Sequence, residues 1–357
     1  ASKYGMALLA TLSPLAFPST CSSTVAPRKS TYVIGGWLPS TPQATIDTIS
    51  PLVESYLNRE LSLKFDPPIT FKFIAVDFDA STYADSMIKA DTMDFLYSYT
   101  GRLGCVEAEF GWPPLVTQRA YINGLSTGAQ GGIMYSLLSN TAIQNLTDLK
   151  GKRIGVGVVL STNSYHLGFQ LLNQHGINLY TDIAQLIFYG NEYNDQVRDI
   201  QQGKIDVGMT ASSWLYVNHP NDISTFRVLN AQHINFEAEQ FPFLTSTDLA
   251  PQFGISVSPT VPLEVKEAVA DALLRINRSN PEAVKMSIAG FESPVSFFKV
   301  RNMLQYMGLL EVSMDGLSGG KCTQAFEDLL HTIVCPDGYV RQSEEVMEHQ
   351  CKMDCLP

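Results

Sequence analysis

Short apolar runs alternate with amphipathic stretches along the first part of the chain. Thr31–Gly36 has the continuous apolar character of a buried strand, and so do Phe71–Val76 and Asp94–Tyr97. Apolar side chains recur at helical spacing from Ile46 to Leu57. A second, shorter helix is expected over Tyr83–Lys89. This β-α-β-α-β order predicts a parallel, doubly wound sheet.

The same order occurs a second time after residue 150. It predicts a second lobe of the same topology. The expected strands are Lys152–Val159, Ala184–Tyr189 and Lys204–Met209, and the expected helices are Asn163–His175 and Asn194–Gln202.

Beyond Pro262 the pattern changes to helices alone. Prolines that follow a polar residue are typical helix starts, and the expected helices are Leu263–Asn277, Pro281–Ala289 and Pro294–Leu310. We therefore expect the chain to cross between lobes twice, near 128–135 and near 252–257. The expected division is an N-terminal arm (1–30), lobe 1 (31–127 and 256–312), lobe 2 (128–255), a flexible linker (313–320) and a Cys-rich module (321–357).

The two halves correspond in detail at the end of one strand each. TMDFLYSYT (92–100) parallels KIDVGMTASS (204–213): an Asp precedes a short apolar strand, and a cluster of hydroxyls follows it. Ligands of open α/β sheets bind beyond the carboxyl ends of strands. Both hydroxyl clusters are therefore expected to face one cleft between the lobes.

Composition and charge narrow the class of protein. The 357 residues are 45% apolar and 17% charged, an ordinary globular composition, and the net charge is -11. This acidic balance, without any run of five basic residues, argues against a nucleic-acid partner. No apolar run reaches the roughly 20 residues of a membrane-spanning helix.

Six cysteines predict an oxidising environment. Four of them fall in the last 36 residues, in a segment with too few aliphatic side chains for a core of its own. Zinc is the competing interpretation of that tail, with His331 and His349 as further ligands, although the spacing lacks paired short knuckles. We expect disulfides and no metal: Cys21 with Cys105 by even cysteine arithmetic and the need to anchor the arm, and the others among themselves. Those others are Cys322, Cys335, Cys351 and Cys355.

The N-terminal stretch allows two interpretations. Residues 4–17 resemble the apolar part of a targeting peptide, or form an arm that packs on the fold or on a partner. Two sequons, at Asn145 and Asn277, agree with a secretory route and with a secreted glycoprotein. The expected location is therefore extracellular or at the cell surface.

Three segments carry a resemblance to a known family. They are NLTDLKGKRIGVGVVLSTNSYH (145–166), GINLYTDIAQLIFYGNEYNDQVRDIQQGKIDVGM (176–209) and APQFGISVSPTVPLEVKEAVADALLRI (250–276). They resemble the phosphate-, phosphite- and phosphonate-binding proteins of bacterial ABC importers, which are type 2 periplasmic binding proteins. The resemblance covers about residues 30–312. It implies a two-lobed α/β fold with hinged closure around a small anion.

The resemblance also implies which residues bind the ligand. Ser161 and Thr162 match the family's phosphonate-binding pair, and with Asn163 they open a helix whose free N–H groups attract anions; plain N-capping is the alternative role. The opposite lobe is expected to contribute the turn from Tyr97 to Thr100. The full set of expected ligand-binding residues is Trp37, Tyr83, Tyr97, Ser98, Tyr99, Thr100, Ser161, Thr162, Asn163, Tyr193, Ser212 and Ser213.

Three positions depart from the family pattern. Tyr193, preceded by Glu192, stands where the phosphonate binders have a His. Ser213 and Phe253 stand where aminophosphonate binders place the carboxylates that hold an ammonium group. The ligand is therefore expected to be a small anionic or polar molecule without a cationic amine.

Motifs for catalysis and cofactor binding are missing from the sequence. No G-x-S-x-G, H-E-x-x-H, P-loop or dinucleotide fingerprint occurs. We expect no cofactor and no enzymatic activity. The favoured hypothesis is a solute-binding or receptor ectodomain, with the Cys-rich tail as a juxtamembrane spacer. The alternatives are a structural or adhesion protein that joins a larger assembly through its arm and tail, and an enzyme on the same fold.

Overall fold

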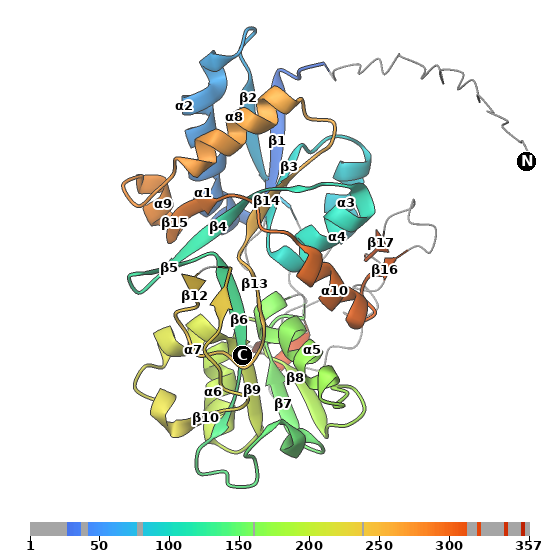
Figure 1. The fold of residues 1–357 in the computed structure, drawn as a ribbon, viewed down its shortest axis with the longest axis vertical. Coiled ribbons are helices and arrows are strands. Elements are labelled where there is room, and N and C mark those ends of the chain that lie inside the picture. Colours follow the sequence, from blue (N-terminus) through green and yellow to red (C-terminus); the bar gives the residue numbers. More distant parts are fainter. Residues whose placement is uncertain are drawn as a thin grey trace, which may run out of the picture.

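The protein is described here by a computed structural model. It covers residues 27–36, 42–76, 81–159, 161–237, 239–312, 320–322, 339–341 and 351–353. Within these ranges the chain forms two α/β lobes, one above the other in Figure 1, each built on its own mixed sheet. The predicted two-lobed α/β fold is confirmed.

The upper lobe contains a seven-stranded sheet. Its strand order is β15-β4-β14-β3-β1-β2, and β5 extends it by pairing with β4. β1 lies between β2 and β3 and is parallel to both, as predicted. The strands are β1 (Thr31–Gly36), β2 (Thr70–Ala75), β3 (Phe95–Ser98), β4 (Pro114–Ile122), β5 (Leu125–Thr127), β14 (Gly254–Val257) and β15 (Ile288–Glu292).

The lower lobe contains a six-stranded sheet with the order β10-β6-β9-β7-β8, and β13 also pairs with β6. β7 lies between β8 and β9 and is parallel to both, which repeats the arrangement of the upper lobe. The strands are β6 (Ala129–Leu137), β7 (Arg153–Val156), β8 (Gln185–Phe188), β9 (Val207–Ala211), β10 (Phe226–Val228) and β13 (Leu249–Pro251). A small hairpin pairs β11 (Asn235–Phe236) with β12 (Glu239–Gln240).

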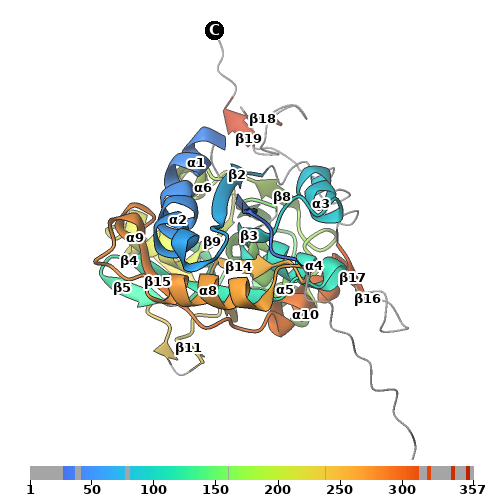
Figure 2. The ribbon, with the colours of Figure 1, turned by 90° about the horizontal axis from the view of Figure 1, so that it is seen from above.

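Helices cover both faces of the upper sheet (Figure 2). On one face lie α1 (Pro42–Ser50), the π-helical turn η1 (Pro51–Tyr56), α2 (Leu57–Leu61), the short 3-10 turn η2 (Ser62–Lys64), α8 (Leu263–Leu274) and α9 (Pro281–Lys285). On the other lie α3 (Ser81–Lys89), α4 (Thr100–Phe110) and α10 (Phe298–Tyr306). The first face buries the alternate side chains Tyr32, Ile34, Phe71, Phe73 and Phe95, as the period of two in a strand requires.

The lower sheet carries shorter helices. They are η3 (Leu146–Leu149), the π-helical turn η4 (Thr162–His166), α5 (Leu167–Gln174), α6 (Tyr193–Gln201), α7 (Ser212–Asn218) and η5 (Ile223–Thr225). α6 and α7 share a core with β6 and β8 around Ile133, Ile187, Val197 and Leu215. No helix of the described ranges is long and apolar enough to cross a bilayer.

The Asp that precedes the third strand has the same role in both lobes. The Asp94 carboxylate accepts a hydrogen bond from the N–H of Val33 at 2.8 Å, and the Asp94 N–H donates to the carbonyl of the same residue. Asp206 makes the same two contacts with Arg153, its carboxylate accepting that residue's N–H at 2.9 Å. Each Asp therefore fixes the register between two neighbouring parallel strands at the edge away from the cleft. These hydrogen bonds explain why an Asp precedes the third parallel strand in both halves of the sequence.

The two chain crossings lie side by side. The N–H of Gln252 donates to the carbonyl of Gly128 at 2.8 Å, and its side-chain amide donates to the carbonyl of Ala129 at 2.8 Å. β6 leaves the first crossing and pairs antiparallel with β9, while β14 leaves the second and pairs antiparallel with β3. We keep 31–127 with 256–312, and 128–255, as the proposed division of the chain, and its second boundary falls inside β14.

The segment after α8 differs from the prediction. The predicted helix over Pro281–Ala289 ends at Lys285 in the structure, so the prediction is wrong for the residues after it. Residues 288–292 form β15, which pairs antiparallel with β4. Gly290 has φ 141°, and a Cβ at this position would lie 2.2 Å from the carbonyl oxygen of Ile276. β15 therefore packs so closely against the segment that follows α8 that only glycine fits at position 290. The strands β4 and β6 were not predicted either.

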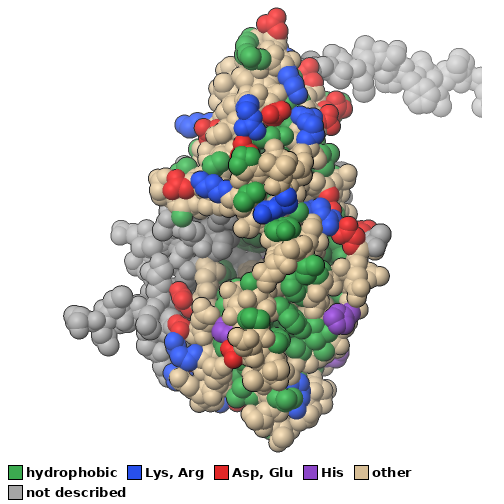
Figure 3. All heavy atoms as spheres, turned by 90° about the vertical axis from the view of Figure 1, so that its left-hand side faces the viewer, with side chains coloured by type: hydrophobic (Ala, Val, Ile, Leu, Met, Phe, Trp, Pro, Cys, Tyr) green, Lys and Arg blue, Asp and Glu red, His purple; other side chains and the backbone are tan. Residues whose placement is uncertain are grey.

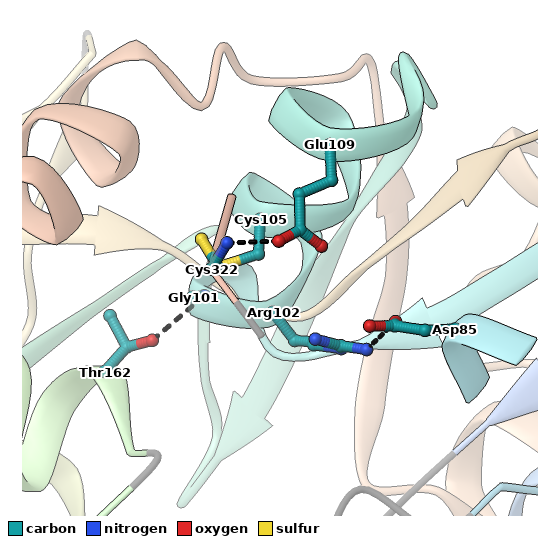
Figure 4. The surroundings of a disulfide bond; sticks show 7 residues. All are labelled: Asp85, Gly101, Arg102, Cys105, Glu109, Thr162 and Cys322. Carbon is teal, nitrogen blue, oxygen red and sulfur yellow. Dashed lines mark hydrogen bonds and ion pairs between the residues drawn. A yellow bond between two sulfur atoms is a disulfide. The ribbon is translucent and has the colours of Figure 1, made fainter. Parts of the chain in front are cut away.

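The predicted pairing of Cys105 with Cys21 is wrong. Cys105, in the middle of α4, forms a disulfide with Cys322, 217 residues further along the chain (Figure 4). Cys322 arrives through the short pair β16 (Glu311–Val312) and β17 (Gly320–Lys321), and its N–H donates to the carboxylate of Glu109 on the same helix. Both sulfur-bearing residues are fully buried, so the segment after α10 is attached to the flank of α4.

The remaining cysteines are only partly covered by the structure. Cys351 begins β19 (Cys351–Met353), which pairs with β18 (Tyr339–Arg341). Cys21, Cys335 and Cys355 lie outside the described residues. Because Cys322 bonds to Cys105, the expected pairing of all four late cysteines among themselves is also wrong.

Replacing Cys322 by Ser is expected to lower the free energy of unfolding by about 2–5 kcal/mol, since the crosslink no longer restricts the unfolded chain. Denaturant unfolding measures the change. Cys105→Ser should give the same loss, and the double variant should add nothing to it. A non-reducing peptide map that joins the Cys105 peptide to the Cys21 peptide would contradict this pairing.

Candidate ligand-binding site

The lower lobe presents the turn that follows β7. Ser161 caps η4: it has extended backbone angles (φ -77°, ψ 123°), and its hydroxyl accepts the N–H of Ser164 at 3.2 Å. Two glycines let other strands approach this turn. A Cβ at Gly132 would lie 2.4 Å from the carbonyl oxygen of Asn163, and one at Gly157 would lie 2.3 Å from Ser164 Oγ. The first turn of the helix is therefore packed tightly against β6 and the end of β7.

The upper lobe presents the start of α4, directly after β3. Tyr99 is its N-cap residue (φ -70°, ψ 153°), and the N–H of Gly101 donates to Thr162 Oγ1 of the lower lobe at 3.2 Å. A Cβ at position 101 would lie 3.0 Å from that oxygen, so glycine allows the close approach. Two helix N-termini, one from each lobe, thus meet at this contact, which Figure 4 shows.

A second polar contact joins the lobes beside the first. Gln130, at the start of β6, donates its side-chain amide to Thr100 Oγ1 at 3.2 Å and to the carbonyl of Pro251 at 2.7 Å. Thr100 Oγ1 itself donates to the same Pro251 carbonyl at 3.1 Å. The start of α4 is therefore held against both crossing segments.

A pocket of about 210 Å³ lies between these elements. This is below the 300–1,000 Å³ of pockets for drug-sized molecules, so in this arrangement of the lobes it suits a small ligand. Figure 3 shows that the molecular surface is hollowed between the two lobes. The pocket is lined by Tyr99, Gln130, Val158, Ser161, Thr162, Asn163, Asn191, Tyr193, Ala211, Trp214 and Phe253.

The structure brings five of the predicted site residues together in this pocket. They are Tyr99, Ser161, Thr162, Asn163 and Tyr193. Five other predicted residues stand close in sequence to the lining residues Tyr99, Ala211 and Trp214 but do not line the pocket themselves. They are Tyr97, Ser98, Thr100, Ser212 and Ser213. Trp37 lies outside the described residues, and Tyr83 falls in α3 with only its backbone described.

The predicted residues behind the pocket hold its frame. Tyr97 is 2% exposed and donates its hydroxyl to the side-chain oxygen of Gln118 on β4. Ser98 and Ser212 are fully buried, and their hydroxyls have no hydrogen-bond partner among the described residues. Ser98 is the last residue of β3 and Ser212 the first of α7, directly after β9, and both are buried in the interior and do not line the pocket.

Six residues that line the pocket were not predicted as ligand-binding from the sequence. They are the small Val158 and Ala211, and the larger Gln130, Asn191, Trp214 and Phe253. Trp214 stands three residues after the end of β9, at the strand edge where ligands are expected. That position was the available signal. Gln130 and Phe253 come from the crossing segments, which have no such pattern.

His166 ends η4 and is fully buried. Its Nε2 lies 2.9 Å from the carbonyl oxygen of Val159, which ties the helix to the loop that leads into Ser161. Burial lowers the pKa of His166 to about 4, against the opposing effect of this hydrogen bond. The imidazole is therefore neutral at neutral pH and acts as part of the support of the loop.

No cation site is evident in the described part of the chain. No group of three or more His, Cys, Asp or Glu side chains there could hold a metal ion. Most of the Cys-rich tail, with His331 and His349, lies outside this part.

A cleft between two doubly wound lobes, with a helix N-terminus from each, defines a two-lobed solute-binding protein. Residues 36–295 match the family model of the periplasmic substrate-binding proteins of phosphonate ABC transporters. The chain belongs to this family. The predicted resemblance is confirmed over these residues.

Solved structures share the fold at low sequence identity. XAC2383 from Xanthomonas citri, solved bound to ATP, is 18% identical with a TM-score of 0.58, over 84% of this chain and 99% of that one. PhnD1 from Prochlorococcus marinus, solved with methylphosphonate, is 14% identical with a TM-score of 0.52, over 78% and 98%. Mh-p37 from Mycoplasma hyorhinis, described as a putative thiamine pyrophosphate transporter, is 11% identical with a TM-score of 0.53, over 79% and 99%. No curated protein sequence matches the chain.

Acid is expected to destabilise the lower lobe through His166. Its pKa of about 4 in the folded chain lies below the ordinary 6.5, so the unfolded chain binds the extra proton as pH falls through this range. The free energy of unfolding should therefore fall by about 1.4 kcal/mol per pH unit between pH 6.5 and 4, or about 3 kcal/mol in all.

Urea unfolding at a series of pH values measures this loss. His166→Gln keeps a donor for the Val159 carbonyl and should reduce the change in the free energy of unfolding between pH 6.5 and 4. His175→Asn, at the exposed C-cap of α5, should leave that change as it is in the unaltered chain. Equal pH dependence of the His166 variant and the unaltered chain would contradict the assignment.

Proposed function

We propose that the chain is a solute-binding protein that captures a small oxyanion or other small polar molecule in the cleft between its lobes. The observation that carries the proposal is the meeting of two helix N-termini in the wall of the pocket. Thr162 opens η4 in one lobe, and Gly101 lies in the first turn of α4 in the other. Free N–H groups and the positive end of the helix dipole favour anions at such positions.

The donors at this point are neutral. Ser161 and Thr162 supply hydroxyls, Gly101 supplies a backbone N–H, and Asn163 supplies an amide. Neutral donors suit a desolvated anion, because each hydrogen bond to a charged group contributes about 1.5–3 kcal/mol. In this arrangement Thr162 Oγ1 accepts the Gly101 N–H, and a ligand oxygen placed between the two helices would take over that donor.

An ammonium group finds no counter-charge in the pocket. None of the described residues that line it is an Asp or Glu. Glu192, which directly precedes the lining residue Tyr193 in the chain, is exposed. The proposed ligand therefore carries no cationic amine.

The proposed location is outside the cytosol, on the cell surface or secreted. The disulfide of Cys105 with Cys322 supports an oxidising environment. Asn145 and Asn277, the two sequon residues, are both exposed, as glycosylation requires. A receptor ectodomain whose tail leads to a membrane, or a member of a larger extracellular assembly, is the proposed setting.

The double variant Ser161→Ala/Thr162→Ala is expected to bind methylphosphonate at least tenfold more weakly than the unaltered chain. Tenfold corresponds to about 1.4 kcal/mol of binding free energy, close to the contribution of a single hydrogen bond to a charged group, so it is the minimum loss expected for two donors. Isothermal titration calorimetry with methylphosphonate and with inorganic phosphate measures the affinities.

A matched control separates binding from helix capping. Asn145 caps η3 through its side chain and does not line the pocket, so Asn145→Ala removes a comparable cap. That variant should keep the unaltered affinity. Unchanged affinity in the double variant, or no binding of any small anion by the unaltered chain, would overturn the proposal and favour a structural role for the fold.

A further inference from the structure

Arg119 on β4 joins the two lobes at a point away from the ligand pocket. Its Nη2 donates to Glu239 Oε2 on β12 of the lower lobe at 2.7 Å, and its Nη1 donates to Glu292 Oε2 on β15 of the upper lobe at 2.6 Å. None of the other ion pairs between described residues joins the two lobes. In the described part of the chain, one guanidinium therefore carries the ion-pair contact between the lobes.

The charged groups lie directly on the first crossing between the lobes. The Nε of Arg119 donates to Ser126 Oγ at 3.0 Å, just before Gly128 in the chain. A Cβ at Gly128 would overlap the Glu292 carboxylate, so glycine lets this carboxylate lie against the backbone of the crossing. In Figure 1 the hairpin of β11 and β12 lies at the level of this crossing. Partners from β5, β15 and β12 thus fix the three nitrogens of one planar group.

The hairpin that carries Glu239 is not densely packed against the upper lobe. A pocket of about 330 Å³ lies between them, lined by Arg119, Glu292 and Val295 on one side and by Phe236 and Phe241 on the other. None of the described residues that line it also lines the ligand pocket. The ion pair therefore spans a gap in the packing, at a distance from the ligand.

An apolar contact accompanies the ion pair. Ile122, the last residue of β4, packs against the cluster that contains Phe241 of the hairpin segment and Ala129 of β6. This contact does not depend on charge. Loss of the ion pair alone is therefore expected to shift the position of the lobes and not to separate them completely.

The two ion pairs of Arg119 respond differently to a movement of the lobes. Arg119 and Glu292 belong to one sheet, because β4 pairs with β15. Glu239 belongs to the other lobe, so a rotation about the crossings that separates β12 from β4 breaks its pair and leaves the first one intact. The Glu239 side chain is 60% exposed, so dissolved salt screens this pair.

We infer that the Arg119–Glu239 ion pair is a salt-sensitive control of the relative position of the lobes, and that it stabilises the described arrangement without any ligand. Leaving this arrangement requires breaking the pair, so part of the cost of lobe movement is set at the crossing, outside the ligand pocket. A contact made in one state shifts a two-state equilibrium only by the free energy that it contributes to that state. For an exposed ion pair the shift is at most about fivefold.

The distance between labels on the two lobes measures this equilibrium. Lys89 on α3 and Gln174 on α5 are both exposed, one in each lobe. Spin labels on unnatural amino acids at these positions leave the cysteines untouched, and double electron–electron resonance gives the distribution of distances between them. No ligand is added, so the outcome does not depend on the proposed function.

Glu239→Gln is expected to raise the population of other arrangements by about twofold or more at low ionic strength, because the amide keeps the shape of the side chain and loses its charge. Glu237→Gln is the matched control. Glu237 is exposed on the same hairpin and lines the same pocket, but it makes no ion pair with a described residue. This variant should keep the distance distribution of the unaltered chain.

A salt series tests the same inference without any substitution. Raising NaCl from about 0.05 M to about 0.5 M should move the unaltered chain toward the distribution of the Glu239→Gln variant, because the Debye length falls severalfold. The distribution of that variant should stay as it is. Thermal unfolding of each variant checks that the fold is retained.

Three results would each overturn the inference. The first is the same distance distribution in the Glu239→Gln variant and the unaltered chain at low salt. The second is an equal shift in the Glu237→Gln variant, since the effect would then follow the charge of the hairpin and not the ion pair. The third is an unaltered chain whose distribution does not change with salt, and this result decides the matter even where a variant does not fold.

Discussion

The arrangement of the molecule depends on one constraint: each sheet is completed by a strand that has just crossed from the other lobe. β14 enters beside β3 and β6 enters beside β9, each antiparallel to its neighbour. Because the crossing segments are bonded to each other through Gln252, the carboxyl ends of the parallel strands in both lobes are directed at the same gap. The helices that follow those strands must then begin in the cleft. A pocket between the lobes follows from the path of the chain, and the side chains that line it decide its chemistry.

That chemistry is divided between the two kinds of element that reach the cleft. The start of η4 supplies hydroxyls and N–H groups, which any helix start with Ser and Thr could offer. The aromatic rings that line the pocket come from several other places: the cap of α4, the second crossing, α6 and α7. Neutral donors and aromatic walls together give a pocket without formal charge in a chain whose net charge is -11. Under the proposed function, local dipoles at the helix starts would have to attract the anion, since the overall charge of the chain opposes its approach.

The parallel parts of both lobes were predictable because each short apolar strand is followed by an amphipathic helix. The helical spacing of apolar side chains is easy to distinguish from the apolar run of a buried strand. Asp94 and Asp206 were recognised as a repeat in the sequence, and the structure explains it, because each carboxylate accepts an N–H from the neighbouring parallel strand. The antiparallel strands were not found for physical reasons. β6 begins AQGG and is buried on nearly every position, so it lacks alternation, and β15 contains a glycine at φ 141° that breaks any local pattern. Of the residues that line the pocket, Ser161 to Asn163 were predicted because they stand at a helix start. Gln130 was missed because it reaches the cleft through tertiary packing alone, and Trp214 was missed although it stands just after the end of β9. The partner of Cys105 could not be deduced, because the parity of a cysteine count does not fix connectivity.

The bond between Cys105 and Cys322 turns most of the protein into a covalent ring. The ring contains the whole lower lobe, both crossings and the returning strands and helices of the upper lobe, while β1 to β3 lie outside it. In the chain-entropy model, a closed loop of this length restricts the unfolded state by about 5 kcal/mol. A single cut by a protease anywhere in the ring, for instance in the exposed hairpin of β11 and β12, would open it without releasing a fragment. The two pieces of the chain would stay covalently linked until the disulfide was reduced as well.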